Sequence, residues 1–400
     1  MRPYDGRRVL LGISGGIAAY KTGWLSRLLT LAGAEVDVVM TRAATQFVGP
    51  ITFEGLTGRR VHTDIFEPGQ ALAHIRLARE AHAVVVAPAT ADFMARAARG
   101  EADDLLTACL LATQAPVLLV PAMNDRMWAH EQSRRNAAHL RDIGYAVLEP
   151  DTGMLAAGEG SGPGRMPEPE AIFAHVGRIL DTAGLTGRSV VVTAGPTREP
   201  MDPVRFISNR SSGKMGVALA AAAWRRGANV TLIAGPLEVP PPTGATLVNV
   251  ETTEEMSQAV AHALDSADAL IMAAAPADFR PAVASEAKIK KSDSPDALEL
   301  APTPDILRTT APCRRSGAIV VGFALETENL VANAAAKLEA KGLDLIVANS
   351  ALEAGSGFGS DTNRVTLIAR GGATEQLPLS RKSEVADVIL DRVEALLRGN

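Results

Sequence analysis

Short continuous runs of Val, Ile and Leu recur along the chain, and most are separated by segments with the apolar period of helices. Uninterrupted apolar runs are typical of parallel strands that are buried on both faces. In the first half, strands are predicted over 8–13, 36–40, 83–87, 116–120 and 145–148, and helices over 17–31, over 93–112 and in a segment ending near Leu180. This alternation predicts a doubly wound α/β sheet.

A second series of the same kind begins after residue 187. Its predicted strands cover 189–193, 229–234, 269–273, 318–323, 344–348 and 365–369, and its predicted helices cover 214–226, 254–265, 330–341 and 383–397. The segment 182–187 between the two series has the character of a linker. We therefore predict two Rossmann-like α/β domains in series, residues 1–181 and 188–400, joined by residues 182–187.

Composition and charge narrow the class of protein. A chain of 400 residues exceeds the size at which a single hydrophobic core keeps growing. The net charge of -5 argues against a nucleic-acid partner, since such proteins carry broad basic faces. Cys109 and Cys313 lack the spacing of a disulfide framework or a zinc site, and the N-terminus resembles neither a signal peptide nor a membrane span. We expect a cytoplasmic enzyme that acts on small molecules.

A glycine turn follows the first predicted strand, in the sequence GISGGIAAYK of Gly12–Lys21. Such a turn lets backbone N–H groups at the positive end of a helix approach a phosphate, and Ser14 adds a hydroxyl. A plain strand-to-helix turn is the alternative. The turn is not GxGxxG, which argues against a third class of function, a nicotinamide-dependent oxidoreductase.

Three further polar segments, 41–47, 88–93 and 121–128, end predicted strands at the edge where open sheets bind ligands. The amide of Asn124 can hydrogen-bond a ring edge or a carboxylate, and Met123 and Met127 can pack on a flavin or simply belong to the core. His74, at the start of a helical run, fits a surface position as well as a catalytic one.

Residues 7–180 resemble the flavin-dependent phosphopantothenoylcysteine decarboxylase family through GISGGIAAYK, HIRLA, PATAD, GEADDLLTA, PAMNDRMW and LAAGEGSGPGRM, in that order. The resemblance implies a flavodoxin-like domain that oxidises the cysteinyl thiol with FMN, releases CO2 and then reduces the enethiolate. By the same resemblance, His74 is catalytic, Asn124 holds the substrate carboxylate and Arg165 belongs to the substrate loop. FMN is expected at Gly12, Ser14, Gly15, Gly16, Thr41, Pro88 and Met123.

Two positions depart from that family. Ala157 stands where the family has the cysteine that protonates the enethiolate, and Asp92 stands where it has an asparagine. An ionised carboxylate cannot donate a hydrogen bond and is unfavourable beside a phosphate. Cys109 lies in an apolar helical run, where a buried structural thiol is the simpler interpretation. An alternative function therefore follows, a ligase whose first half is an inactive flavin-binding or oligomerisation module.

In the second half, polar donors gather in the loop of TREPMDPVRFISNRSSGK, which contains Arg205, Asn209 and Lys214. These donors suit a phosphate-bearing ligand, although a solvated loop that caps the next helix is the alternative. Asp278 ends a later strand in AAAPADFRP and can meet a ribose or a metal ion. The run AKIKKSD follows, with Lys288, Lys290 and Lys291, either as a solvated loop or closing over a triphosphate.

These segments, with GFALETE, KGLDLIVANS and DTNRVTLI, resemble the phosphopantothenate-cysteine ligase family over residues 187–398, in the bacterial form fused behind the decarboxylase. The resemblance implies that CTP and Mg2+ activate phosphopantothenate as an acyl-cytidylate, which the cysteine amine then attacks. It implies catalytic roles for Asn209 and for Lys288 or Lys290, and a homo-oligomer built from decarboxylase trimers and ligase dimers. CTP or phosphopantothenate is expected at Arg205, Ala275, Asp278, Phe323 and Lys341, and Mg2+ at Asp278.

Overall fold

The computed structural model describes residues 4–66, 68–181, 184–290, 297–350, 352–353, 355–357 and 359–399. The chain divides into two compact units, Met1–Thr182 and Ala183–Asn400. Residues 182 and 183 of the expected linker lie outside the described residues. The rest of that segment packs on the second unit, because Leu185 is buried and its N–H donates to the carbonyl of Arg226 at 2.9 Å.

The described part of the first unit contains a six-stranded parallel sheet in the order β3-β2-β1-β4-β5-β6. Its strands are β1 (Arg8–Ile13), β2 (Glu35–Met40), β3 (Val61–His62), β4 (Ala83–Ala89), β5 (Val117–Pro121) and β6 (Ala146–Val147). The chain starts in the middle of the sheet, moves to one edge, and returns to continue on the other side of β1. This order confirms the predicted doubly wound fold, with its switch point between β1 and β4.

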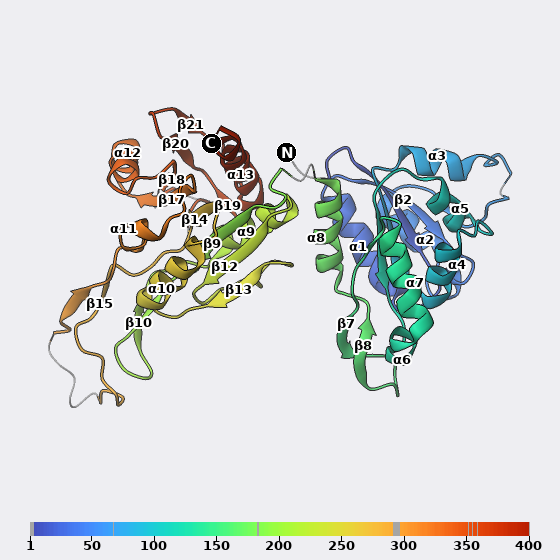
Figure 1. Ribbon diagram of the computed structural model, residues 1–400, viewed down its shortest axis with the longest axis horizontal. Helices are drawn as coiled ribbons and strands as arrows, with labels where there is room; N and C mark the ends of the chain where they lie inside the picture. Colours follow the sequence, from blue (N-terminus) through green and yellow to red (C-terminus); the bar gives the residue numbers. More distant parts are fainter. Residues whose placement is uncertain are drawn as a thin grey trace. The chain divides into compact units, whose positions relative to one another are not determined.

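Helices cover both faces of this sheet (Figure 1). One face packs against α1 (Ala19–Leu31), α2 (Pro50–Thr57) and α8 (Pro169–Leu180), and the other against α3 (Ala73–Glu80), α4 (Ala91–Arg99), α5 (Leu105–Ala112), α6 (Asp125–Ala129) and α7 (Glu131–Asp142). A short antiparallel hairpin, β7 (Asp151–Met154) with β8 (Ser161–Arg165), precedes α8.

The single helix predicted over 93–112 is wrong, since the structure has α4 and α5 there. Gly100 ends α4 in the left-handed region, with φ of +69°, which a side chain would strain. Asp104 then begins α5 with a capping box, in which it exchanges hydrogen bonds with Thr107. The apolar period continues through both helices and hides the break between them.

The second unit contains an eight-stranded sheet among its described residues, in the order β13-β12-β9-β14-β17-β18-β20-β21. The strands are β9 (Ser189–Ala194), β12 (Asn229–Ala234), β13 (Thr246–Asn249), β14 (Ala269–Met272), β17 (Ile319–Glu326), β18 (Leu345–Ser350), β20 (Thr366–Ala369) and β21 (Thr374–Gln376). The first six in this chain order are parallel, and β20 and β21 extend the sheet in antiparallel pairing. This unit is again doubly wound, with its switch point between β9 and β14.

One face of this sheet packs against α10 (Thr253–Leu264), α11 (Ile306–Thr309) and α12 (Leu330–Ala340), while α9 (Lys214–Arg225) packs against α13 (Lys382–Gly399). Three small antiparallel pairs lie outside the main sheet: β10 (Arg198–Pro200) with β11 (Phe206–Ser208), β15 (Phe279–Pro281) with β16 (Leu300–Pro302), and β19 (Thr362–Asn363) with β22 (Ser380–Arg381). Short 3-10 turns complete the elements at Ala44–Gln46 and Ala311–Cys313. None of the helices in the described residues has the length and apolarity that crossing a membrane requires.

Candidate active sites

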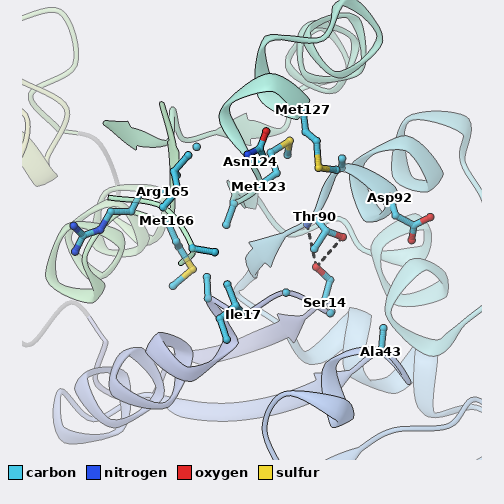
Figure 2. Close-up of a pocket in the computed structure, with 18 of the residues that line it drawn as sticks. Ser14, Ile17, Ala43, Thr90, Asp92, Met123, Asn124, Met127, Arg165 and Met166 are labelled. Atoms are coloured by element: carbon cyan, nitrogen blue, oxygen red, sulfur yellow. Dashed lines mark hydrogen bonds between the residues drawn. The ribbon is translucent and has the colours of Figure 1, made fainter. Parts of the chain in front are cut away.

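A cavity of about 1000 Å³ opens at the switch point of the first sheet (Figure 2). Strand ends on both sides of the switch point contribute to it, together with the β7–β8 hairpin. Seven residues expected in the site line it: Ser14, Gly15, Gly16, Thr41, Met123, Asn124 and Arg165. The volume lies at the upper end of small-molecule pockets, which suits a nucleotide-sized cofactor beside a substrate.

The glycine turn after β1 is shaped by close packing. A Cβ on Gly15 would lie 2.4 Å from the Cβ of Ala43, so a side chain there would collide with the turn after β2. The N–H groups of Gly15, Ile17 and Ala18 donate to no described residue, and all three residues line the cavity at the start of α1. Unpaired N–H groups at a helix N-terminus favour an anion such as a phosphate.

Ser14 joins the two strands of the switch point. Its Oγ donates to the carbonyl of Pro88 at 2.7 Å. The same Oγ accepts the N–H of Thr90 at 3.0 Å (Figure 2). Two expected FMN residues do not line the cavity. Pro88 supports the site through its carbonyl, and a Cβ on Gly12 would lie 2.5 Å from Leu106, which makes Gly12 a packing glycine beneath the site.

Asp92 lines the cavity, and its carboxylate is ion-paired. Arg96, one helical turn later, donates from Nε to Asp92 at 3.1 Å, and its Nη1 contacts Asp103 at 3.0 Å and Asp104 at 2.8 Å. Burial opposes the charge of Arg96, but these carboxylates outweigh burial and raise its pKa above the ordinary value. Arg96 therefore partly screens the charge of Asp92, although it shares its own charge among three carboxylates.

The opposite wall of the cavity comes from β8 and the segment that follows β5. Asn124 caps α6 by accepting the N–H of Arg126 at 2.9 Å, which leaves its amide N–H groups to donate. The N–H of Met123 donates to the carbonyl of Gly164 at 3.0 Å, and a Cβ on Gly164 would lie 2.2 Å from the carbonyl of Met123. The guanidinium of Arg165 is paired with Glu168, while the rest of Arg165 lines the cavity.

Ala157 lies in the β7–β8 connection, whose neighbours Ala156 and Glu159 line the cavity. Cys109 is fully buried in the core below, and burial followed by the charge of Asp104 raises the pKa of its thiol to about 12. Cys109 therefore cannot substitute for a proton donor in the cavity.

His74 lies near the start of α3 and does not line the cavity of its own chain, so its catalytic role stays a prediction.

The second site lies at the switch point between β9 and β14. The N–H of Ala275 donates to the carbonyl of Gly195 at 2.9 Å, which brings the ends of these strands together. Asn209, directly after β11, donates from Nδ2 to the carbonyls of Ala275 and Pro276 at 3.1 and 3.0 Å. Two of the expected residues, Asn209 and Ala275, are thus in direct contact.

A smaller cavity of about 190 Å³ adjoins this contact. Three expected residues, Asp278, Phe323 and Lys341, line it together. The ammonium of Lys341 pairs with Asp305 at 3.3 Å, and sequence reasoning did not identify Asp305. The cavity has the size of a single ring system, and Phe323 offers an aromatic surface to it.

Arg205 and the lysine run occupy a different part of the unit. The guanidinium of Arg205 is bonded to Asp202 and to the carbonyl of Ile289, so a direct contact with substrate stays a prediction. Lys288 and Lys290 are exposed, and Lys291 lies outside the described residues. Asp202 was missed, although the Asp-Pro dipeptide of MDPVR is a turn signal that points to a side chain bonded to its own backbone.

A buried polar network behind this site was also missed. Glu199 accepts the N–H and the hydroxyl of Thr253 at 2.9 and 2.8 Å, and Thr253 is in turn 2.8 Å from the hydroxyl of Thr197. Thr197 accepts the N–H of Ala277 at 2.9 Å. This network fixes the backbone next to Asp278, and no periodic pattern in the sequence could have indicated it.

The side chains of the described residues hold no cluster of three or more His, Cys, Asp and Glu groups suited to a metal ion. Two carboxylates of the described residues line the smaller cavity, Asp278 and Asp305. Asp305 is paired with Lys341, which leaves Asp278 as the one without an ion-pair partner there. A lone carboxylate still fits the way Mg2+ binds in many nucleotide sites, where substrate phosphates and water complete the shell.

The two units match different families. Residues 1–180 match the family described as "Flavoprotein", and residues 185–397 match the "DNA/pantothenate metabolism flavoprotein C-terminal domain". The chain is 43% identical over 401 residues to the coenzyme A biosynthesis bifunctional protein CoaBC of Vibrio vulnificus strain YJ016, covering 99% of this chain and 100% of the relative. It is 46% identical over 409 residues to the protein of the same name from Mycobacterium tuberculosis strain H37Rv, covering 98% and 97%. A crystal structure of the C-terminal domain of a protein with that name matches at 39% identity with a TM-score of 0.47, over 55% of this chain and all of that chain.

Proposed function

Because the chain belongs to the family of coenzyme A biosynthesis bifunctional proteins, we propose that its second unit joins cysteine to phosphopantothenate with CTP and that its first unit decarboxylates the product with FMN. The chain is thus a bifunctional enzyme with a ligase domain and a decarboxylase domain, and the alternative of a ligase with an idle first half is not favoured. The observation that carries the proposal is that seven of the residues expected for decarboxylation line one cavity and three of those expected for ligation line another, each at a switch point.

The first cavity fits FMN. The free N–H groups of Gly15, Ile17 and Ala18 would hold the phosphate, and Met123 with the side chain of Ile17 would pack against the ring. Bound FMN supplies the oxidation of the cysteinyl thiol and the later return of a hydride. Asn124, with donors not used by its cap, would orient the substrate carboxylate whose loss as CO2 leaves an enethiolate.

We assign to Glu159, in its acid form, the proton that the enethiolate carbon then needs; because the side chain is exposed, solvent returns the proton after each turnover. Three carboxylates line the cavity, those of Asp92, Asp104 and Glu159, and Arg96 pairs with the first two. The side chain of Glu159 has no hydrogen-bond or ion-pair partner among the described residues. It lies two positions from Ala157 in the same turn, where its N–H donates to the carbonyl of Ala156 at 3.0 Å.

Replacing Glu159 by Gln keeps the shape of the loop and removes the acid. CO2 release should continue, while the unsaturated thiol accumulates and the saturated product forms about 10²- to 10⁴-fold more slowly, as mass spectrometry of the thiols would show. Ala157→Cys in the Glu159→Gln background should restore the saturated product. Glu101→Gln, which alters an exposed carboxylate paired with Arg99, serves as the control. An unchanged product ratio in Glu159→Gln would assign the proton to water or another group.

In the second unit, the cavity beside Phe323 would take the cytosine ring, and Asp278 at its rim would meet the ribose or help to hold Mg2+, which would supply positive charge to the phosphates. The phosphopantothenate carboxylate attacks the α-phosphorus, and the bond to the β-phosphate breaks as pyrophosphate leaves with its electron pair. Lys288 and Lys290 would neutralise that charge. Asn209, held against the carbonyls of Ala275 and Pro276, would bind the acyl-cytidylate until the cysteine amine displaces CMP.

The test uses the full chain with phosphopantothenate, cysteine, CTP and Mg2+. Equal amounts of CMP and phosphopantetheine, with CO2, are expected, together with the absorption spectrum of bound flavin. ATP in place of CTP, and EDTA in place of Mg2+, are the controls for the nucleotide and the metal. If no CMP forms under these conditions, the ligase assignment is wrong. If phosphopantothenoylcysteine accumulates, the decarboxylase assignment is wrong.

A further inference from the structure

The Asp202 carboxylate is a charged group in the interior that the proposed reaction does not use. Its side chain is 0% exposed, although Asp202 lies in the loop between β10 and β11. Oδ1 accepts the N–H groups of Val204 and Arg205, both at 2.8 Å, and Oδ2 accepts Nε of Arg205 at 3.0 Å and Nη2 at 2.5 Å. The hydrogen bonds from Arg205 lower the pKa of this carboxyl group below its ordinary range, so it stays ionised.

The same ion pair holds a peptide from a distant part of the chain. Oδ2 of Asp202 accepts the N–H of Ile289 at 3.2 Å, and Nη2 of Arg205 donates to the carbonyl of Ile289 at 2.9 Å. Both backbone groups of Ile289 are therefore bonded, as they would be beside a neighbouring strand. A further bond, from the N–H of Ser285 to the carbonyl of Met201 at 2.9 Å, anchors the segment four residues earlier.

Ile289 lies between the two exposed lysines of the described run. The backbone is thus fixed on both sides of Ile289, while the ammonium groups of Lys288 and Lys290 reach no acceptor among the described residues. The Asp202 carboxylate is covered by the chain, and covering a charge is costly unless its partners are in place. Its partners are the guanidinium of Arg205, which is itself 45% exposed, and the backbone of Ile289. Fixed backbone with free amines is what a preorganised anion site requires.

The hairpin that carries the ion pair also carries Asn209. β10 and β11 pair from Arg198 with Ser208 to Pro200 with Phe206, and Asn209 follows at once and bonds to the carbonyls before Asp278. One rigid hairpin therefore touches the lysine segment at its loop and the proposed nucleotide site at its base. The distance between these two parts of the site is set by the hairpin.

We propose that Asp202 and Arg205 form a clasp on the Ile289 peptide, and that this clasp positions Lys288 and Lys290 for the departure of pyrophosphate. The proposal rests on the proposed ligase function. Asp202 and Arg205 are positioning residues, and their effect on the reaction passes through the two lysines. This positioning role differs from the expectation that Arg205 binds substrate itself.

The first measurement concerns the clasp alone and needs no substrate. Trypsin cuts after lysine, and cleavage after Lys288 and Lys290 requires that the segment open. Arg205→Ala should raise the rate of these cuts at least about tenfold over the wild type, because two charge-assisted contacts are lost. Arg392→Ala is the matched control, since Arg392 is 47% exposed and paired with Glu375, whereas Arg205 is 45% exposed. Equal cleavage in Arg205→Ala and Arg392→Ala would overturn the clasp.

The second measurement concerns the reaction. Arg205→Ala should lower kcat for CMP release by about 10- to 100-fold while the Kd of phosphopantothenate changes less than about threefold. Arg205→Lys should recover only part of kcat, because one ammonium cannot reproduce the fork that bonds Asp202 and Ile289 together. Asp202→Asn keeps the guanidinium of Arg205 but weakens the clasp, so it should also lower kcat. A native circular dichroism spectrum of this variant would show that the loss does not come from unfolding.

A double-mutant cycle separates positioning from direct substrate contact. In a Lys288→Ala/Lys290→Ala background, Arg205→Ala should add less than about a twofold loss, since the groups that the clasp positions are gone. A full additional loss would mean that Arg205 acts on the substrate itself, which overturns the proposal. If the wild type releases no CMP, the ligase function fails, whereas the trypsin result still decides whether the clasp exists.

Discussion

At the scale of single residues, the environment decides what each charged group can do. Asp92 and Asp104 face the first cavity but share the cation of Arg96, whereas Glu159 faces it unpaired. Cys109 has the side chain that the family uses as proton donor, yet burial raises the pKa of its thiol to about 12. Residue type alone would rank the cysteine first. Its place in the cavity lining and its lack of an ion-pair partner among the described residues favour Glu159 as the proton donor.

His62 should make the first unit sensitive to acid. This edge-strand residue is 5% exposed and its Nδ1 has no partner among the described residues. Burial lowers the pKa of His62, and Arg76, Arg60 and Arg59 lower it further against the opposing charge of Asp37. The folded state therefore prefers neutral histidine, and stability should be full above about pH 6.5 and fall as the pH drops through the lowered pKa.

The comparison of wild type with His62→Gln isolates this effect. Between pH 7.5 and 5.0, the unfolding temperature of the first unit should fall by about 2–5 °C more in the wild type than in His62→Gln. Differential scanning calorimetry of both proteins at each pH measures the difference. His139→Gln, on α7, should show the dependence of the wild type. Parallel pH curves for His62→Gln and the wild type would contradict the assignment.

At the scale of elements, α9 and α13 meet around a buried guanidinium. Arg226, at the end of α9, contacts Asp391 at 2.7 Å and Glu394 at 2.8 Å, and it donates to the carbonyl of Asp387 at 2.9 Å. Its side chain is 9% exposed, and although burial opposes its charge, the carboxylates of Asp391, Glu394 and Asp387 raise its pKa. The C-terminal helix is therefore held by charge as well as by apolar packing.

Arg226→Met should destabilise the second unit by about 3 kcal/mol, because it removes the buried cation that Asp391 and Glu394 share, although Asp387 keeps Arg225 and Glu394 keeps the exposed Arg398. Urea unfolding followed by circular dichroism would measure the loss. Arg392→Ala removes an exposed pair on the same helix and should cost less than about 1 kcal/mol. Equal losses in the two variants would show that the buried network contributes no more than a surface pair.

The sequence predicted long elements better than short ones. The buried strands β1, β4, β9 and β17 appear as apolar runs because both faces of each strand are covered. The hairpins β7–β8 and β10–β11 were not predicted, since strands of three to five residues on an exposed surface show no period. The strand ends carried most of the expected site residues, but the clasp of Asp202 and Arg205 depends on a loop meeting a distant segment, which local patterns do not encode.

At the scale of the whole molecule, the two units share one architecture, a doubly wound sheet with a switch point. Each sheet has its first strand in the interior, and each places a cavity or contact where the order reverses, after β1 and β4 in one and after β9 and β14 in the other. Carboxyl ends of neighbouring strands diverge there and leave room for a ligand. The fold accounts for where both reactions would occur, while the loops account for which reaction occurs.

His74, which the family resemblance implies to be catalytic, does not line the first cavity of its own chain. Two apolar residues that line it, Tyr20 and Met154, are 64% and 70% exposed, and a second copy of the chain over the cavity mouth would bury them. The homo-oligomer expected from the sequence would supply that cover. We therefore predict that His74 of one copy completes the cavity of another.

Mixing two inactive variants tests this prediction. His74→Asn and Asn124→Ala damage different parts of the site, so mixed oligomers should contain some sites with both residues intact and recover about a quarter of the wild-type decarboxylation rate. A mixture of His74→Asn with His74→Gln should recover nothing. Native mass spectrometry must first show that the copies exchange. If they exchange without any gain in CO2 release, His74 of one copy does not complete the cavity of another, and the prediction is wrong.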